Sequence, residues 1–295
     1  MQAVAAWLVA RPLNAVLALA ATISLPYLSF LSGVVLVLLV LHKGPKAAFL
    51  DAVIAGGLLA VVGLVAQGSL ATVLSGAVVM WLPAMLLAVL LIATRSLTLT
   101  LQVSVIMAIL LMIGFFLVVG DLVGFWRNIL VEIVEVWREL GLTEQADLLD
   151  GQLDAVAEQM TTIAVLTSWA VHSVNCVLGY LLYRHLPGET ADFGRFRDLN
   201  LGRVVAITMA LASVGAVLSD AVWLQNIAFV MFFVFWLQGL AIVHWLYGEG
   251  HLPVFGVVAV YVLMPFLNVI LLMGLAVVGY VDTWFRLRRP RIKAT

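Results

Sequence analysis

Long apolar segments are the feature that most limits how this chain can fold. Residues 70–93 and 97–119 run without a single charged side chain. Each is long enough to cross the hydrocarbon core of a bilayer, which takes about 20 helical residues. Only helices and closed barrels satisfy every backbone polar group in lipid, and runs of this length favour helices. We therefore expect an all-α fold, a polytopic helical bundle integral to the membrane, with further spans at 51–66, 160–184, 202–219 and 221–247.

The composition excludes the soluble alternatives. Hydrophobic residues make up 64% of the chain and charged residues 11%, and the mean hydropathy is +1.17. A soluble domain has roughly 45–50% apolar and about 25% charged residues. Too few polar side chains remain to cover a water-facing body of this size, which excludes disorder, a coiled coil, a disulfide scaffold and a soluble enzyme domain.

Two further apolar stretches each contain a proline. Pro26 interrupts residues 13–41 and Pro265 interrupts residues 252–284, and proline kinks or breaks a helix. Each stretch is long for one span and short for two, so each is either one kinked helix or a pair of short segments. We expect eight to ten membrane segments, with the N-terminal apolar run retained rather than removed as a signal peptide.

Basic residues predict the orientation. Lys43 and Lys46, then Arg95, then the segment from Arg184 to Arg203 lie in loops that alternate consistently, and loops rich in Lys and Arg face the cytoplasm. The acidic segment 121–158 then lies outside, in the periplasm if the membrane is a bacterial inner membrane. The basic tail 286–295 should be cytoplasmic, which favours either splitting the last stretch at Pro265 or making it partly re-entrant.

The outer segment 121–158 has the pattern of an amphipathic helical hairpin. Gly141 suits the end of its first helix and Thr143 the N-cap of the second. One interpretation is an interfacial helix lying flat on the outer leaflet; the others are a lid over a cavity and a docking face for a periplasmic partner. The apolar positions with helical spacing are Trp126, Ile129, Leu130, Ile133, Val134 and Trp137, then Leu148, Leu149, Leu153, Val156 and Met160.

Polar side chains inside hydrocarbon are costly, which makes them the first candidates for function. His172, Asn175 and Cys176 fall at i, i+3 and i+4 of one helix, and Trp169 extends the same side. The pattern favours a polar seam that hydrogen-bonds a neighbouring helix, followed by a ligand-contacting face. A metal site is disfavoured, because structural zinc needs four ligands and the chain has no complementary Cys/His pair. The candidate ligand-binding residues here are Trp169, His172 and Asn175.

The 221–247 segment carries a second candidate set. Gln238 and His244 lie among Trp236, Trp245 and Tyr247. Aromatic residues near a helix end usually form the interfacial belt, and an aromatic binding box is the alternative. Gln238 and His244 therefore join the candidate ligand-binding residues.

Catalytic patterns are absent from the sequence. It contains no glycine-rich phosphate loop, HExxH or GxSxG motif. The carboxylates closest to the membrane, Asp51, Asp121, Asp220 and Asp282, lie at the ends of expected spans, whereas proton-coupled transport usually needs a buried one. We expect no enzyme, no cofactor, no metal ion and no nucleic-acid partner.

Small residues spaced four apart allow the backbones of two helices to approach closely. Ala6 and Ala10 have this spacing, as do Ala52 and Gly56, but a chain rich in alanine and glycine produces such pairs by chance. Ala6 and Ala10 are candidates for contact with a partner.

Near the C-terminus, Asp282 and Arg286 are also four apart and are expected to pair on a helix. The basic tail that follows is either an anchor attracted to anionic membrane lipids, at about 1 kcal/mol per basic residue, or a contact for a cytoplasmic protein. Asp282 and Arg286 are the second pair of candidate partner-binding residues.

Three segments resemble a known family. They are Gly279-Tyr-Val-Asp-Thr-Trp-Phe-Arg286, Trp236-Leu-Gln-Gly-Leu-Ala-Ile-Val-His244 and Phe196-Arg-Asp-Leu-Asn-Leu-Gly202. They resemble segments of the YybS-like predicted membrane proteins, a bacterial family of unknown function. That family is distantly similar to the substrate-binding S components of energy-coupling-factor vitamin transporters and to the rod-shape protein MreD.

The resemblance implies an S-component-like membrane core over residues 1–185, including the hairpin 121–158, then C-terminal membrane helices over 186–285 and the tail 286–295. Ala6 and Ala10 would then face a membrane coupling subunit. The leading hypothesis is a bacterial inner-membrane protein that binds a small or lipid-like ligand, with a role in its transport as a further expectation. The alternative is a non-transporting scaffold in a membrane assembly, in the manner of MreD.

Overall fold

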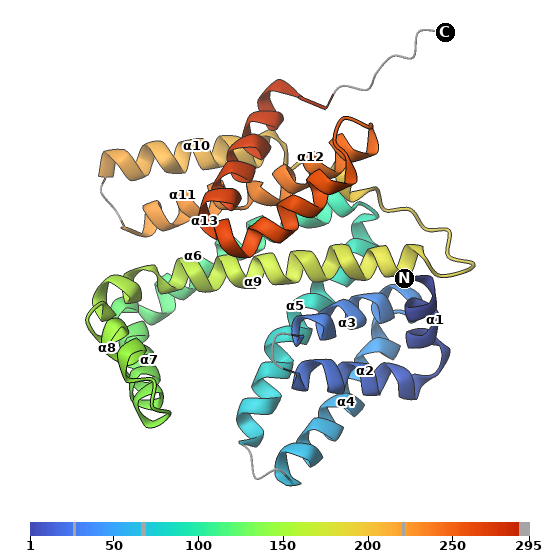
Figure 1. The fold of residues 1–295 in the computed structure, drawn as a ribbon, viewed down its shortest axis with the longest axis horizontal. Coiled ribbons are helices and arrows are strands. Elements are labelled where there is room, and N and C mark those ends of the chain that lie inside the picture. Colours follow the sequence, from blue (N-terminus) through green and yellow to red (C-terminus); the bar gives the residue numbers. More distant parts are fainter. Residues whose placement is uncertain (26–27, 66–68, 220–221, 289–295) are drawn as a thin grey trace. The chain divides into compact units, whose positions relative to one another are not determined.

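The computed structural model describes residues 1–25, 28–65, 69–219 and 222–288. Every regular element in these ranges is a helix (Figure 1), which confirms the expected all-α membrane fold. The elements are α1 Gln2–Ala10, α2 Pro12–Ser24, α3 Phe30–Lys43, α4 Pro45–Val65, α5 Leu70–Thr94, α6 Leu97–Val119, α7 Leu122–Glu139, α8 Thr143–Asp150, α9 Leu153–Arg184, the 3-10 helix η1 Phe196–Asp198, α10 Gly202–Ser219, α11 Val222–Phe233, α12 Phe235–Gly248 and α13 Val254–Phe285.

Six helical segments within the described ranges are long and apolar enough to cross a membrane. They are α4, α5, α6, α9, α10 and the segment Trp223–Gly248, which contains most of α11 and all of α12. The number rises to seven if α1 and α2, which are bent by 112° at their junction, form one broken span. Three shorter apolar helices, Phe30–Lys43, Val254–Leu267 and Val269–Phe285, account for the difference from the eight to ten segments expected.

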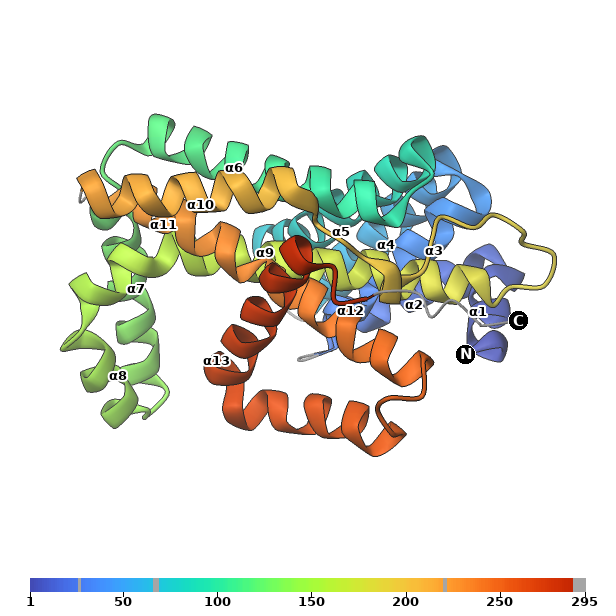
Figure 2. The ribbon, with the colours of Figure 1, turned by 90° about the horizontal axis from the view of Figure 1, so that it is seen from above.

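The two proline-containing stretches differ in the structure. Pro26 lies outside the described residues, and the chain on its two sides forms two separate short helices, α2 and α3, which pack against each other. Pro265 lies inside α13, which remains helical. Figure 2 shows the first and second halves of α13 running in different directions. A pair of segments therefore occupies 13–41, and α13 consists of two apolar halves, Val254–Leu267 and Val269–Phe285, that run in different directions.

The chain divides into two compact units. Unit 1 consists of residues 1–104 and 170–199, and unit 2 consists of residues 105–169 and those from 200 onward. The long helix α9 contributes its first part to unit 2 and its second part to unit 1. The expected functional division at residues 185 and 286 stays a prediction, because compactness does not define a functional domain.

Each unit has one helix buried over much of its length. In unit 1 this is α3, where every residue from Ser32 to Val40 is buried and which packs against α2, α4 and α5. In unit 2 it is α12, buried from Phe235 to Ile242 and packed along α13. A helix that is apolar on all sides is typically buried. Buried polar groups of each unit contact these two helices.

The segment after α9 is tied to the helix ends of unit 1. The Tyr183 hydroxyl donates to Glu189 (2.5 Å), and His42 Nδ1 lies 2.7 Å from the same carboxylate. The Gly194 N–H and the Tyr180 hydroxyl donate to Asp192, each at 3.0 Å. These two hydrogen bonds lower the pKa of Asp192 below its ordinary value.

The helical hairpin expected at 121–158 is present and has its own core. Leu130 and Val134 of α7, Ala146 of α8, and Leu153 and Ala157 of α9 form a buried cluster. The interpretation of its position, flat on the leaflet or free as a lid or docking face, stays a prediction.

Two details at the tip of the hairpin follow from backbone geometry. Gly141 ends α7 with φ +78°, the left-handed conformation that glycine tolerates best. Thr143 is the first helical residue of α8 and Leu142 precedes it at the N-cap, so the N-cap expected at Thr143 is wrong by one residue. Leu148, expected on the apolar face, is largely exposed.

Candidate functional site

An apolar cavity of about 420 Å³ lies in unit 1 against α3, α4 and α5. It is open on one side, where the lining residues Phe49, Val53, Val78 and Leu82 are each more than half exposed. Its lining is entirely apolar, and its volume falls in the range of ligand-binding clefts, roughly 300–1,000 Å³. The residues that line it include Phe49, Ala52 and Gly56 of α4 and Ala77, Trp81 and Met85 of α5.

Small residues leave this space open. A Cβ added at Gly56 would have only Trp81 within 4 Å, at 3.8 Å, which is an ordinary contact. A Cβ at the next residue, Gly57, would meet no described atom within 4 Å, and Gly57 is exposed. A larger side chain at position 56 would therefore enter the cavity, and one at position 57 would point away from it. The pair Ala52–Gly56, expected to permit close helix approach, lines a space instead.

Trp81 forms the inner wall of the cavity. Its indole Nε1 donates to Ser32 Oγ at 2.7 Å, and Ser32 Oγ donates in turn to the Leu19 carbonyl at 2.9 Å. A hydroxyl can donate and accept at once, so the two buried polar groups satisfy each other. This chain of bonds ties the ring to α3 and α2 and fixes it in place, while α4 and α5 pack against each other.

His172 and Asn175 are both buried on the part of α9 that belongs to unit 1. Asn175 packs directly onto Gly33 of α3, where an added Cβ would collide with the amide. Its Nδ2 donates to Met80 Sδ of α5 at 3.5 Å, while its Oδ1 has no hydrogen-bond partner among the described residues. Asn175 thus contacts two neighbouring helices, as the polar-seam interpretation requires.

Neither His172 nor Asn175 lines the cavity. Trp169 is buried on the part of α9 that belongs to unit 2. The interpretation of these three residues as a ligand-contacting face stays a prediction.

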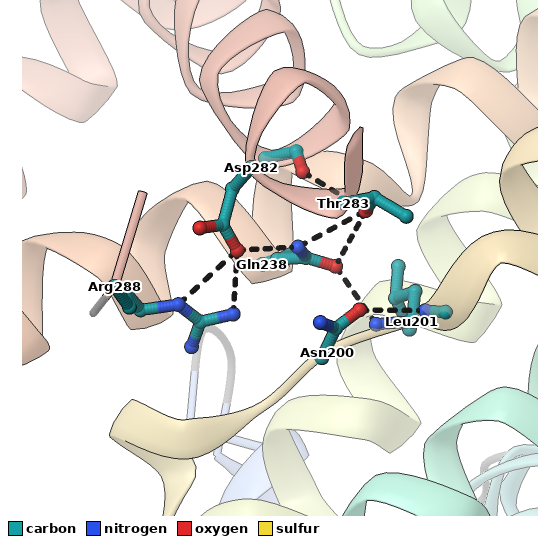
Figure 3. A network of polar contacts seen from close by, with 8 residues as sticks. Asn200, Leu201, Gln238, Asp282, Thr283 and Arg288 are labelled. Carbon is teal, nitrogen blue, oxygen red and sulfur yellow. Dashed lines mark hydrogen bonds and ion pairs between the residues drawn. The ribbon is translucent and has the colours of Figure 1, made fainter. Parts of the chain in front are cut away.

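The most extensive polar network lies in unit 2, where α12 meets α13 (Figure 3). Gln238 Oε1 accepts from the Leu201 N–H at 2.7 Å. Its Nε2 donates to Asp282 Oδ2 at 2.9 Å and to Thr283 Oγ1 at 3.2 Å. Gln238, Asp282 and Thr283 are at most 3% exposed, so each of these bonds replaces water that the groups cannot reach.

The two helices touch at their backbones beside this network. An added Cβ at Gly239 would collide with the backbone of Leu275, and one at Gly279 with the carbonyl of Phe235. Glycine is needed at both positions for α12 and α13 to approach this closely.

Asp282 pairs with Arg288 rather than with Arg286. Arg288 donates to Asp282 Oδ2 from Nη2 (2.7 Å) and Nε (3.1 Å). The expected Asp282–Arg286 pair is wrong because α13 ends at Phe285. Arg286 adopts a left-handed conformation with φ +50° and is exposed. Asp282 Oδ1 accepts no hydrogen bond from any residue in the described ranges.

The remaining candidates lie apart from this network. His244 Nε2 lies 2.8 Å from the Tyr261 hydroxyl. Ala6 is half-buried and Ala10 is exposed on α1. Asp220 and the tail beyond Arg288 lie outside the described residues. Within the described ranges, no three His, Cys, Asp or Glu side chains gather closely enough to hold a metal ion.

Comparison with known proteins identifies a family. The family model described as "Predicted membrane protein (DUF2232)" matches residues 13–283, and the chain belongs to this family. The three segments that carry the YybS-like resemblance meet in the network around Gln238, at Leu201, Gln238 and Asp282. The resemblance to S components and to MreD stays a prediction. No curated protein and no solved structure matches the chain.

Proposed function

We propose that this membrane protein binds an apolar, lipid-like ligand in the α4–α5 cavity of unit 1. The observation that carries the proposal is the wholly apolar lining of a space of about 420 Å³. The open side of the cavity is formed by exposed apolar side chains such as Phe49 and Leu82, and an apolar lining offers water no hydrogen-bond partners. An acyl chain fits both the lining and the volume, and the bilayer supplies acyl chains.

The charge distribution supports the finer parts of this proposal. We place the protein in a bacterial inner membrane, with Lys43, Lys46 and Arg95 on the cytoplasmic side. The hairpin α7–α8 is then periplasmic. Binding of an acyl chain needs no catalytic step, so the proposal assigns no enzymatic activity.

Two neighbouring glycines provide the test. Leucine at Gly56 would fill part of the cavity, whereas leucine at Gly57 would face away from it, and both changes raise helix propensity equally. The probe is the methyl ester of parinaric acid, an uncharged fluorescent acyl compound. We expect Gly56→Leu to weaken binding of this probe at least about tenfold. Gly57→Leu should bind like the wild type. Equal affinities of the two variants, both folded by thermal unfolding, would contradict the cavity as the site.

The face of α9 provides a competing location for the ligand. Asn175→Leu and His172→Leu remove polar groups that do not line the cavity. We expect both variants to retain the probe. If Asn175→Leu loses the probe and Gly56→Leu retains it, the binding site lies on the face of α9 rather than in the cavity. A role in transport would appear as movement of the probe between vesicle leaflets that Gly56→Leu slows.

A second candidate function is a scaffold in a membrane assembly. The hairpin favours it, because α7 and α8 share a buried cluster with the start of α9 and carry exposed acidic side chains. Arg138 joins the two helices through Asp147 (3.1 Å) and Asp150 (2.8 Å), and the bonds to Asp150 and Asp147 raise the pKa of Arg138.

If the protein is a scaffold, replacing residues 122–150 by a short linker should release a stoichiometric protein partner. Probe binding and membrane insertion should persist. Deletion of the tail 286–295 tests the cytoplasmic side in the same way, and a partner retained by both variants would contradict the scaffold function.

A further inference from the structure

Three residues with basic side chains lie at the junction of α3 and α4, and two of them are engaged. His42 lies against Glu189 at 2.7 Å. Lys43 donates to Asp51 at 2.5 Å, and that carboxylate is 8% exposed. Lys46 is exposed and forms no hydrogen bond or ion pair with any residue that the structure describes. Lys46 is therefore the cation at this junction that is available to a ligand.

The helical repeat places Lys46 beside the cavity. Lys46, Phe49 and Val53 occupy positions i, i+3 and i+7 of α4, which share one side of a helix, and Phe49 and Val53 line the cavity. Lys46 precedes Phe49 by three residues, about 4.5 Å along the helix axis. The flexible lysine stem carries its ammonium group toward the membrane surface.

This arrangement matches an amphiphile that lies along α4. An acyl chain in the apolar cavity would bring its polar end to the first turn of the helix, where the cation is. We infer that the ligand of the α4–α5 cavity is an acyl amphiphile with an anionic headgroup, a carboxylate or phosphate, which Lys46 binds. The inference rests on the proposed function, and it adds the charge of the ligand and the residue that recognises it.

Parinaric acid and its methyl ester test the inference, because they share one chain and differ in charge. In nonionic micelles, at a pH where the acid is ionised, the wild type should prefer the acid. Lys46→Gln should weaken acid binding about fivefold, the effect of one basic residue near a surface, and leave ester binding unchanged. Lys46→Arg should restore the preference.

A control variant separates a specific contact from general surface charge. Arg95 ends α5, is exposed, and is assigned to the same membrane side. Arg95→Gln should leave the acid-to-ester preference unchanged. An equal loss of preference in Arg95→Gln, or an unchanged preference in Lys46→Gln, would overturn the inference. Inorganic phosphate should not displace the acid, because it has no chain; displacement would indicate a site for a free anion and would also overturn it.

The two proposals fail in different ways. If Gly56→Leu weakens both probes and Lys46→Gln weakens neither, the cavity stands and the anionic headgroup is wrong. If Lys46→Gln weakens acid binding while Gly56→Leu leaves both probes bound, the anion binds without the cavity, and both proposals are wrong.

Discussion

Glycines on packed helices have opposite consequences in the two units. In unit 2, Gly239 and Gly279 bring α12 and α13 into backbone contact. In unit 1, Gly56 faces a cavity. Gly239 and Gly56 differ in the group that faces them on the neighbouring helix. Gly239 faces the backbone of Leu275, whereas Gly56 faces the ring of Trp81, which its bond to Ser32 fixes in place.

The comparison shows that a small residue permits close approach without enforcing it. In unit 1, the small residues beside a large ring held by a hydrogen bond leave space next to it, even though α4 and α5 pack against each other. In unit 2, polar side chains next to the glycines join the helices instead, through Gln238 and Asp282. The glycines of unit 2 thus serve helix contact, whereas Gly56 of unit 1 borders a space.

The largest effect should come from alanine at the contact glycines. We expect Gly239→Ala to lower the free energy of unfolding by about 3 kcal/mol, because the backbone of Leu275 would have to shift. Gly56→Ala should change it by less than about 1 kcal/mol, in the stabilising direction, through helix propensity. Unfolding by denaturing detergent, followed by circular dichroism, measures both. Gly57→Ala controls for propensity, and equal effects at positions 239 and 56 would remove the contrast between the units.

The next effect concerns the ion pair that closes the contact region. The Asp282 and Arg288 side chains are 2% and 10% exposed. Removing either one therefore leaves the charge of the other buried, with neither its ion-pair partner nor full hydration. We expect Asp282→Ala and Arg288→Ala each to lower the free energy of unfolding by about 2 kcal/mol. The double variant should lose less than the sum. Arg286→Ala, two residues away and exposed, should have little effect; a loss equal to that of Arg288→Ala would contradict the pairing.

The smallest effect should come from the wall of the cavity. Trp81→Phe removes the bond to Ser32, which contributes about 1 kcal/mol, and widens the cavity. We expect slightly lower stability together with undiminished binding of the uncharged acyl probe. Trp126→Phe, which removes a similar bond of 2.7 Å to Thr161 in the hairpin, is the matched control and should not alter binding. Loss of the probe in Trp81→Phe would mean that the ring is a contact for the ligand rather than a support for the space.

The fold could be predicted where the signal is local. Uninterrupted apolar runs such as 70–93 became α5, and the three–four spacing from Trp126 to Trp137 became α7, because hydropathy and periodicity depend on neighbouring residues only. The stretch with Pro265 could not be resolved, because proline permits both a break and a bend. The surrounding packing decides between them.

The site was predictable only in part. Gln238 stands out as a polar group in apolar surroundings, and Asp282 stands out by its four-residue spacing from Arg286. Arg288 was missed because the expected pairing assumed that the helix continues through Arg286. The cavity was missed because the pair Ala52–Gly56 has the same spacing whether a neighbouring helix closes on it or not. The distinguishing signal is Trp81 on α5, whose bond to Ser32 is non-local and absent from any sequence pattern.

The most direct test of ligand binding is native mass spectrometry of the protein released gently from its own membrane. Wild type, Gly56→Leu and Gly57→Leu would be compared under the same conditions. We expect an acyl amphiphile to remain bound to the wild type and to Gly57→Leu, and to be lost from Gly56→Leu. The same bound lipids in all three proteins, or none in the wild type, would contradict the assignment of the cavity as a ligand site.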